Sequence, residues 1–393
     1  MSEFDTYAGS SGWFSRNLGV LSAVSFLQDA ASDLIYPVLP IFLRNTLLAP
    51  VWAIGLTEGL ADAMAALSKI VAGRASDGRR KRPFIGVGYG IAALGKVIVA
   101  VAGVWPVVLL GRATDRVGKG MRGSPRDALI AGSIEPRFRG RAFGFHRSMD
   151  SAGAVVGPLL GLGAYEAFQH HIRPLLFVAI VPAVLSVLLV FAVRETAPVA
   201  VLAPDSLAVA PHLPRPFWRA VTLLSVFALF NFPDALLLLR ASSLGMSLVG
   251  VILIYCLFNA VQSLLSYPAG ALADHLGRNK IIALGFAIFG VTYLGLGLAN
   301  RCWWVWVLFP LYGGYAALTD GVGKAWISDL VPSAAHGRAL GLQQGLAGLA
   351  CVIAGLWAGL LWNGDGVTPL LISGTAGVVV SIAMLILSVT DDA

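Results

Sequence analysis

Two pairs of carboxylates lie one helical turn apart within long apolar stretches of the chain. Asp29 and Asp33 form the first pair, and Glu58 and Asp62 form the second. A charge near the centre of a bilayer costs about 2.5–3.5 kcal/mol on insertion scales, so such a group needs a partner, an aqueous cavity or a function. A carboxylate whose surroundings change between a dry environment and a nearby cation binds and releases a proton. Both pairs are therefore candidates for proton exchange or cation binding.

Further charged residues share helical faces in the next apolar runs. Arg112, Asp115, Arg116 and Lys119 follow an i, i+3, i+4, i+7 spacing, which places them on one face. His146 and Asp150 lie one turn apart. We expect Arg112 or Arg116 to compete with the proton for a carboxylate, and His146 to relay protons. The predicted proton-coupling residues are Asp33, Asp62, Asp150, Arg112, Arg116 and His146.

Polar residues in the second half complete a predicted binding path. Pro233 leaves the carbonyl one turn earlier without its helical bond, so the chain there is either a broken helix that offers an oxygen to a ligand or a kinked helix. Aromatic residues such as Tyr36 and Tyr255 are placed to line the same path. The predicted substrate-binding residues are Asp29, Asp33, Glu58, Asp62, Asp115, Asn231, Asp234, Asn259 and Gln262.

The elements that must position these residues are membrane-spanning helices. The chain has 393 residues, of which 57% are hydrophobic and 12% charged, whereas a soluble domain has roughly 25% charged residues. A span needs about 20 mostly apolar residues, and the long continuous runs do not alternate as barrel strands do. We therefore expect an all-α membrane protein. Its twelve predicted spans are 18–43, 51–73, 84–104, 105–127, 140–166, 173–193, 217–239, 246–272, 280–299, 302–330, 337–362 and 367–389.

Basic residues predict the orientation of these spans. Lys and Arg cluster in the loops after spans 2, 4 and 8, and such loops stay on the cytoplasmic side. Both termini are therefore expected in the cytoplasm. The net charge of +7 is explained by this clustering, so no nucleic-acid partner is expected. A proline-containing segment without helical periodicity predicts two six-helix bundles, at 1–194 and 217–393, joined by a cytoplasmic linker at 195–216.

The two halves resemble each other at matched positions. GRAFG at 140–144 recurs as GRALG at 337–341, and Gly73 and Asp77 recur as Gly270 and Asp274, in each case 197 residues later. An even number of spans in each half preserves orientation, so these are parallel repeats related by an axis along the membrane normal. We expect the substrate path to form between them.

The chain resembles the major facilitator superfamily over essentially its whole length, and two motifs carry this resemblance. The segment 270–280 matches that family's GxLaDxxGR signature, and the copy at 73–81 lacks its second glycine. Span 5 resembles the motif of antiporting exporters, in which Gly153 and Gly157 make a smooth face and Pro158 can bend the helix. The resemblance implies that these residues gate the transporter. The predicted gating residues are Gly73, Asp77, Arg80, Gly270, Asp274, Arg278, Gly153, Gly157 and Pro158.

The resemblance implies a monomeric multi-pass transporter of the bacterial inner membrane that works by alternating access without a cofactor. It implies a proton-coupled antiporter that exports a small molecule. Two alternatives stay open: an exporter of a divalent metal or another inorganic ion, and a proton-coupled importer. The metal alternative would use Asp29, Asp33, His146, Asn231 and Asp234 as ligands.

An enzyme is not expected. Ser148 and His146 are two residues apart and face different sides of a helix, which disfavours an intramembrane hydrolase. The sequence also contains no GxxxxGK[ST] segment for ATP hydrolysis.

Overall fold

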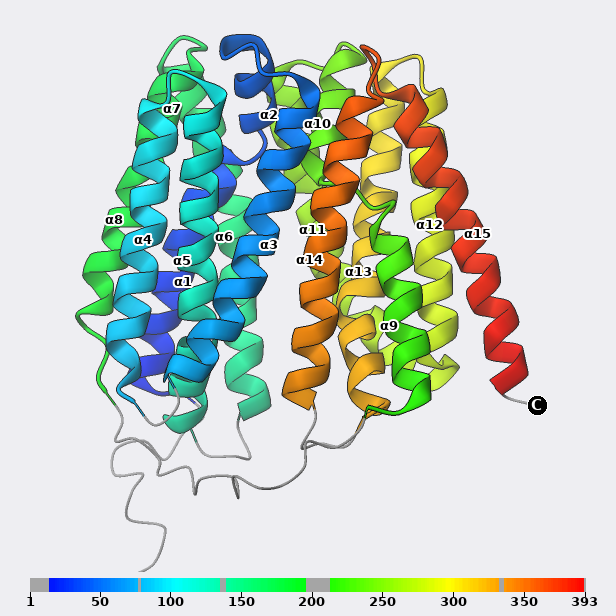
Figure 1. Ribbon diagram of the computed structural model, residues 1–393. Helices are drawn as coiled ribbons and strands as arrows, with labels where there is room; N and C mark the ends of the chain where they lie inside the picture. Colours follow the sequence, from blue (N-terminus) through cyan, green and yellow to red (C-terminus); the bar gives the residue numbers. More distant parts are fainter. Residues whose placement is uncertain (1–13, 77–78, 135–138, 196–212, 332–335, 392–393) are drawn as a thin grey trace, which may run out of the picture. The chain divides into compact units, whose positions relative to one another are not determined.

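Helices are the regular elements in the part of the chain that the structure, a computed structural model, describes (Figure 1). The described residues are 14–76, 79–134, 139–195, 213–331 and 336–391. The all-α prediction is confirmed for these residues. The helices are α1 (Arg16–Ile35), α2 (Leu39–Ile41), α3 (Val51–Ser76), α4 (Lys81–Val101), α5 (Trp105–Gly132), α6 (Arg139–Ala167), α7 (Ile172–Val178), α8 (Ile180–Val190), α9 (Arg215–Ala228), α10 (Asp234–Ser243), α11 (Leu248–Leu276), α12 (Arg278–Leu298), α13 (Val305–Asp329), α14 (His336–Leu360) and α15 (Val367–Asp391), with a π-helical segment at Phe42–Thr46 and a 3-10 turn at Cys302–Trp304.

Seven helical segments among the described residues are long and apolar enough to cross a membrane. Helix α5, which carries the charged stripe of Arg112, Asp115, Arg116 and Lys119, is not one of the seven. Each of the twelve expected ranges is nevertheless occupied by helix, and the number of spans stays a prediction. The seven segments are Arg16–Thr46, Lys81–Val101, Ile172–Val190, Leu248–Ala273, Arg278–Leu298, Ala339–Leu360 and Val367–Ile386.

Three of the ranges expected as single helices are interrupted. In 173–193, α7 ends at Val178 and α8 begins at Ile180. In 18–43, α1 ends before Pro37, and Pro40 lies in the first turn of α2. In 217–239, α9 stops five residues short of Pro233, which is the N-cap of α10. Proline lacks the N–H that continues a helix, but it is tolerated at a helix start. The chain around Pro233 is therefore a broken helix rather than a kinked one.

The helices group into two compact units. The first unit contains 1–36 and 64–206, and the second contains 37–63 and 207–393. The predicted bundles at 1–194 and 217–393 differ from this grouping at 37–63, which packs with the second unit. Helix α3 is therefore shared, with its first half in the second unit and its second half in the first.

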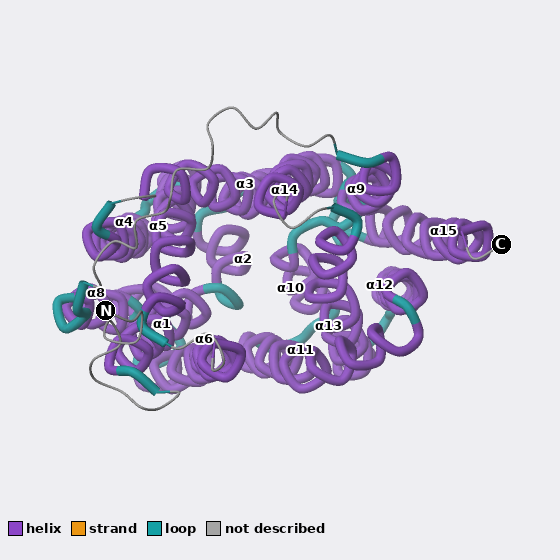
Figure 2. Tube along the Cα trace, turned by 90° about the horizontal axis from the view of Figure 1, so that it is seen from below, coloured by secondary structure: helices purple, strands orange, loops and turns teal. Residues whose placement is uncertain are grey.

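Glycines allow the helices of the first unit to approach closely. Helix α4 packs along α5, α1 packs along α6, and α8 lies against α1 and α4, as Figure 2 shows in a view along the helices. A Cβ added at Gly95 would lie 2.5 Å from the backbone nitrogen of Asp115, and one at Gly153 would lie 2.6 Å from the carbonyl oxygen of Phe26. Such distances are shorter than any van der Waals contact, so these crossings require glycine.

The second unit has an aromatic core. The closest packed pairs are α12 with α15, and α13 with α11 and α12. Phe227 of α9 stacks on Phe286 of α12 with ring centroids 3.9 Å apart, and Phe289 stacks on Tyr293 at the same separation. Stacked rings bury large apolar areas and add about 0.5–1.5 kcal/mol per pair beyond that burial. This core holds α9 against α12.

The ends of α4 and α12 are capped by arginines in the same manner. Their C-cap residues, Ala102 and Ala299, lie 197 positions apart and share an extended backbone conformation. Arg173 donates from Nη2 to the carbonyl oxygen of Ala102 at 2.9 Å, and Arg240 donates from Nη2 to that of Ala299 at 2.9 Å. The buried Arg240 also donates to the carbonyls of Leu296 at 3.1 Å and Asp365 at 3.0 Å. The last carbonyls of a helix need such donors.

Replacing Arg240 by glutamine should lower the stability of the purified protein. Each buried carbonyl that loses its donor costs about 1–3 kcal/mol. We expect a clear decrease in the melting temperature measured in detergent. Arg301 is exposed in the same connection, so Arg301→Gln is the matched control and should change the unfolding free energy by less than about 0.5 kcal/mol. Equal melting temperatures for the two variants would contradict the capping role.

Candidate functional site

A buried ion pair joins α4 and α5 in the first unit. The Nζ atom of Lys96 lies 2.8 Å from Oδ1 of Asp115, and Nη1 of Arg112 lies 3.7 Å from Oδ2 of the same carboxylate. None of the three side chains is more than 5% exposed. Sequence reasoning missed Lys96, although an isolated lysine in an apolar run is itself a signal of an internal partner. The geometry favours a structural role for Asp115, and its predicted contact with substrate stays a prediction.

Three arginines of α5 contact aromatic rings or a hydroxyl group of neighbouring helices. The guanidinium carbon of Arg122 lies 4.4 Å from the centre of the Tyr89 ring, and that of Arg112 lies 5.7 Å from Tyr36. Nη1 of Arg126 donates to Oγ of Ser25 on α1 at 2.8 Å. These three arginines therefore face neighbouring helices of the unit, where cation–π contacts partly offset desolvation, whereas Lys119 is exposed.

His146 and Asp150 form a second group in the first unit, on α6. Nδ1 of His146 lies 3.1 Å from Oγ of Ser22. Its Nε2 lies 3.8 Å from Oδ1 of Asp150, and both atoms are buried without a hydrogen-bond partner among the described residues. Asp29 of α1 and Arg126 of α5 act electrostatically on the imidazole. The distance between this nitrogen and this oxygen can shorten to that of a hydrogen bond when a proton binds.

Further predicted residues of the first unit act electrostatically on α5. Asp29 and Asp33 both act electrostatically on Lys119 of α5. Arg116 acts on Lys119 and on Asp115. The structure thus places Asp29, Asp33, Arg116, His146 and Asp150 in one unit with the buried ion pair.

Asp234 is within electrostatic range of three other carboxylates of the second unit, and we call Asp234, Asp62, Asp320 and Glu58 the acidic cluster. Asp234 lies in the first turn of α10 and accepts a hydrogen bond from the hydroxyl of Tyr312 at 2.6 Å. Three further carboxylates act on it electrostatically, namely those of Asp62, Asp320 and Glu58. Glu58 is 2% exposed. Glu58 and Asp62 of α3 therefore act on the Asp234 carboxylate of α10, as their predicted common role requires.

Tyrosines beside this cluster were not predicted. Nδ2 of Asn231 donates to the hydroxyl oxygen of Tyr315 at 3.0 Å, and the hydroxyl of Tyr293 lies 3.5 Å from Oδ1 of Asn231. The rings of Tyr312 and Tyr315 are stacked with centroids 5.3 Å apart. A tyrosine in an apolar run is as typical of a core as of a site, so its sequence position carried little information.

Gln262 and Asn259 of α11 were both predicted to bind substrate, and their side-chain amides have different surroundings. Nε2 of Gln262 donates to Oδ2 of Asp320 at 2.9 Å, which places it at the edge of the acidic cluster. Nδ2 of Asn259 donates to the carbonyl of Tyr255 in its own helix at 3.0 Å. The carbonyl that Pro233 releases belongs to Leu229, and it accepts a hydrogen bond from Nε1 of Trp357 at 2.8 Å. An internal donor thus uses the oxygen that the broken-helix alternative would offer to a ligand.

The predicted gating residues are described in part. Asp77 lies outside the described residues, and the surroundings of Gly73 and of the Asp274 side chain are also undescribed. Nε of Arg278 lies 2.9 Å from Oδ2 of Asp329 at the end of α13, whereas Arg80 is exposed at the N-cap of α4. Gly270 has open space where a Cβ would stand.

The span-5 motif lies at the contact of α6 with α1. A Cβ on Gly157 would lie 2.9 Å from the Cα of Ala30, and α6 continues through Pro158. The smooth glycine face is thus used for close packing against the helix that carries Asp29 and Asp33.

No group of three or more His, Cys, Asp or Glu side chains that could hold a metal ion occurs in the ranges that the structure describes. Of the ligands named for the metal alternative, Asp29, Asp33 and His146 lie in the first unit, and Asn231 and Asp234 lie in the second. The geometry of each unit taken alone therefore adds no support to a metal site.

Known proteins resemble the chain along most of its length. The family model of the Major Facilitator Superfamily matches residues 21–255 and 220–393. An uncharacterized MFS-type transporter of Methanocaldococcus jannaschii is 30% identical over 361 residues, which are 89% of this chain and 89% of the relative. The class H tetracycline resistance protein of Pasteurella multocida is 24% identical over 383 residues, which are 88% of this chain and 92% of the relative.

A solved structure shares the fold. A crystal structure of the peptide transporter POT with bound sulfate superposes with a TM-score of 0.82 at 13% identity and covers 99% of this chain and 98% of that one. At this identity the likeness concerns the fold.

Proposed function

We propose, from the premise that this chain belongs to the Major Facilitator Superfamily and is a multi-pass membrane protein, that it is a secondary transporter exporting a cationic small molecule in exchange for protons. Its twelve spans would lie in a bacterial inner membrane with both termini in the cytoplasm, and the two repeats would alternate the access of a shared path. The partners in this proposal are the lipid bilayer, the substrate and protons, and the working unit is a monomer.

The acidic cluster around Asp234 carries the proposal. The groups that act on Asp234 are a tyrosine hydroxyl and three carboxylates. Repulsion among carboxylates opposes their full ionisation, so the cluster is stabilised by binding either a proton or a cation. A proton and a cation do not both bind tightly, because each neutralises the same negative charge. Competition for one site is the physical basis of antiport, since the arrival of one ligand favours the release of the other.

The first unit supports the same function with a separate proton group. His146 and Asp150 present buried atoms 3.8 Å apart, with Asp29 acting on the imidazole. We propose that these residues, with Asp33, move protons, and that Arg112 or Arg116 competes for the carboxylates. The export direction is supported by the glycine contact of α6 with α1 in the antiporter-like motif and by the similarity to tetracycline resistance proteins.

Replacing Asp234 by asparagine tests the proposal. Asparagine still accepts a hydrogen bond from Tyr312, but it neither binds a proton nor carries a charge. In everted vesicles with an imposed pH gradient, we expect wild-type protein to accumulate ethidium or tetracycline, used as a cationic and a relative-derived probe. Asp234→Asn should reduce pH-driven accumulation at least about tenfold, because one proton-binding carboxylate is lost. Asp33→Asn and Asp150→Asn should act in the same direction.

The exposed carboxylate of Glu166 at the end of α6 supplies the control. Glu166→Gln should transport at the wild-type rate, and all variants should be present in the membrane at equal amounts. Wild-type pH-driven flux in Asp234→Asn would contradict the assignment. Flux of the probes in the opposite direction under the same gradient would identify the importer alternative.

A further inference from the structure

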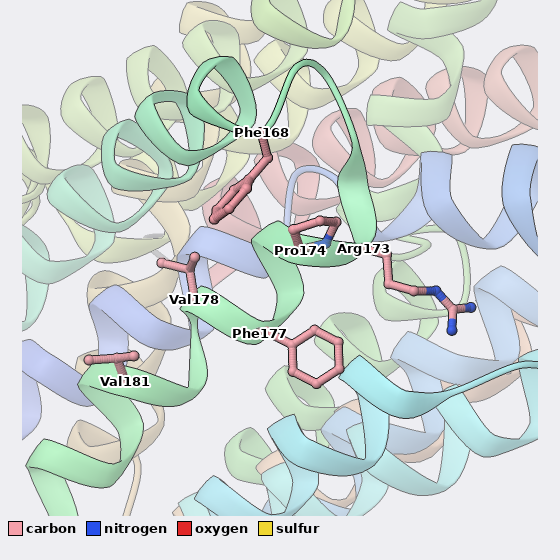
Figure 3. A pocket seen from close by; sticks show the side chains of 6 residues that line it. All are labelled: Phe168, Arg173, Pro174, Phe177, Val178 and Val181. Atoms are coloured by element: carbon pink, nitrogen blue, oxygen red, sulfur yellow. The ribbon is translucent and has the colours of Figure 1, made fainter.

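An apolar groove lies on the surface of the first unit where α6, α7 and α8 meet. Figure 3 shows Phe168, Val178 and Val181 on one side of α7. Arg173 and Phe177 lie on the other side, and Pro174 lies between the two groups. The groove has a volume of about 530 Å³. Its lining, which we call the α7 groove, consists of Phe168, Arg173, Pro174, Phe177, Val178 and Val181.

The local sequence creates this groove. Helix α7 ends at Val178, and α8 starts at Ile180 with Pro182 in its first turn. Proline cannot donate to the carbonyl of Val178, so the helix is interrupted there and its surface is indented. The segment Ile172–Val190 is also strongly apolar, and only 28% of its most apolar window is buried inside the protein. Most of this surface therefore contacts lipid in a membrane.

Arg173 stands beside this apolar surface in a connection that the charge pattern places away from the cytoplasm. The loops on that side hold few basic residues, so orientation does not explain an arginine there. Arg173 is exposed, and its Nη2 caps the carbonyl of Ala102 at 2.9 Å, which fixes the guanidinium at the end of α4. A guanidinium has five N–H donors in a planar arrangement that matches a phosphate group.

We propose that the α7 groove binds one anionic phospholipid, with its phosphate at Arg173 and an acyl chain that runs past Phe177 and across Pro174 to Val178 and Val181. Both phenylalanines of the groove are exposed, so their rings offer apolar surface to the chain. The side chain of Arg173 reaches the headgroup level while its stem lies along the apolar surface. The occupant would brace the α7–α8 break and the end of α4, which Arg173 already connects.

Native mass spectrometry of delipidated protein tests this proposal without any transport measurement, so its failure and that of the proposed function are distinguishable. Phosphatidylglycerol and phosphatidylcholine of equal chain length are titrated separately. One basic residue near a headgroup favours the anionic lipid about fivefold, and we expect this preference in the wild type. Arg173→Gln should abolish the preference, and Arg173→Lys should retain it, which separates loss of charge from loss of fold.

A tryptophan pair tests the chain-binding part of the groove. Val181→Trp fills the groove and should reduce the binding of both lipids, whereas Val184→Trp, on an exposed position of α8 outside the lining, should bind as the wild type does. Glycerol phosphate without acyl chains should not displace bound phosphatidylglycerol. Equal binding of the two lipids by the wild type, an unchanged preference in Arg173→Gln, or equal binding by the two tryptophan variants would overturn the proposal.

Discussion

Replacing Lys96 by methionine is expected to lower the unfolding free energy by about 3 kcal/mol, because a buried carboxylate loses its nearest cation and its charge is then only partly compensated. The carboxylate that loses its partner is that of Asp115, and its other close cation is Arg112 at 3.7 Å. Methionine has nearly the length of lysine and fills the same space, so the loss reports charge rather than volume. Denaturant or thermal unfolding of the purified protein in detergent measures the effect.

A double-mutant cycle separates the ion pair from its surroundings. Asp115→Asn alone should also destabilise the protein, and Lys96→Met combined with Asp115→Asn should cost less than the sum of the single changes. Lys280→Met at an exposed position of α12 is the control and should stay within about 0.5 kcal/mol of wild type. Additive losses in the cycle would show that the two charges do not depend on each other.

The second large effect is expected for Gly157→Ala in α6. The new methyl group would lie 2.9 Å from the Cα of Ala30, and its neighbours there are backbone atoms of α1 that cannot rotate away. Forced overpacking of this kind costs about 1–3 kcal/mol. We expect a lower melting temperature and loss of pH-driven ethidium accumulation, because α1 carries Asp29 and Asp33 and would be displaced from α6.

Gly163 offers a matched control within the same helix. A Cβ at Gly163 would meet no atom within 4 Å, so Gly163→Ala adds a methyl group without a clash. Alanine is favoured over glycine in a helix by about 0.8–1.0 kcal/mol, and this variant should be neutral or slightly more stable. The two glycine substitutions therefore have opposite expected signs. Equal destabilisation by both would mean that the α6 to α1 contact is not the cause.

The positions of the helices followed from composition and periodicity, whereas their interruptions depended on single residues. Runs of about 20 apolar residues are long enough to cross a bilayer wherever they pack, and helix occupies each expected range. The break before Pro233 was one of two sequence-based alternatives. Whether a proline kinks or ends a helix depends on what satisfies the released carbonyl, and here Trp357 donates to that of Leu229 from 128 residues away.

In the candidate site, too, some features were predictable from the sequence and others depend on helix packing. Neighbours one turn apart, such as His146 and Asp150, are determined by the helical period and were predictable. The partners that complete each group are distant in sequence: Lys96 pairs with Asp115 across 19 residues, and Tyr312 with Asp234 across 78. Such pairs form only when helices pack, and an isolated Lys96 or Tyr312 in an apolar run does not indicate which helix it will face.

The repeat shows this division most clearly. The sequence alone determined two related halves offset by 197 residues, and the chain ends α4 at Ala102 and α12 at Ala299 with that spacing. The arginines that cap these ends, Arg173 and Arg240, do not share the offset. A carbonyl at a buried helix end requires a donor but accepts one from any direction. Local sequence therefore decides where each helix ends, and tertiary packing alone decides which side chain reaches it.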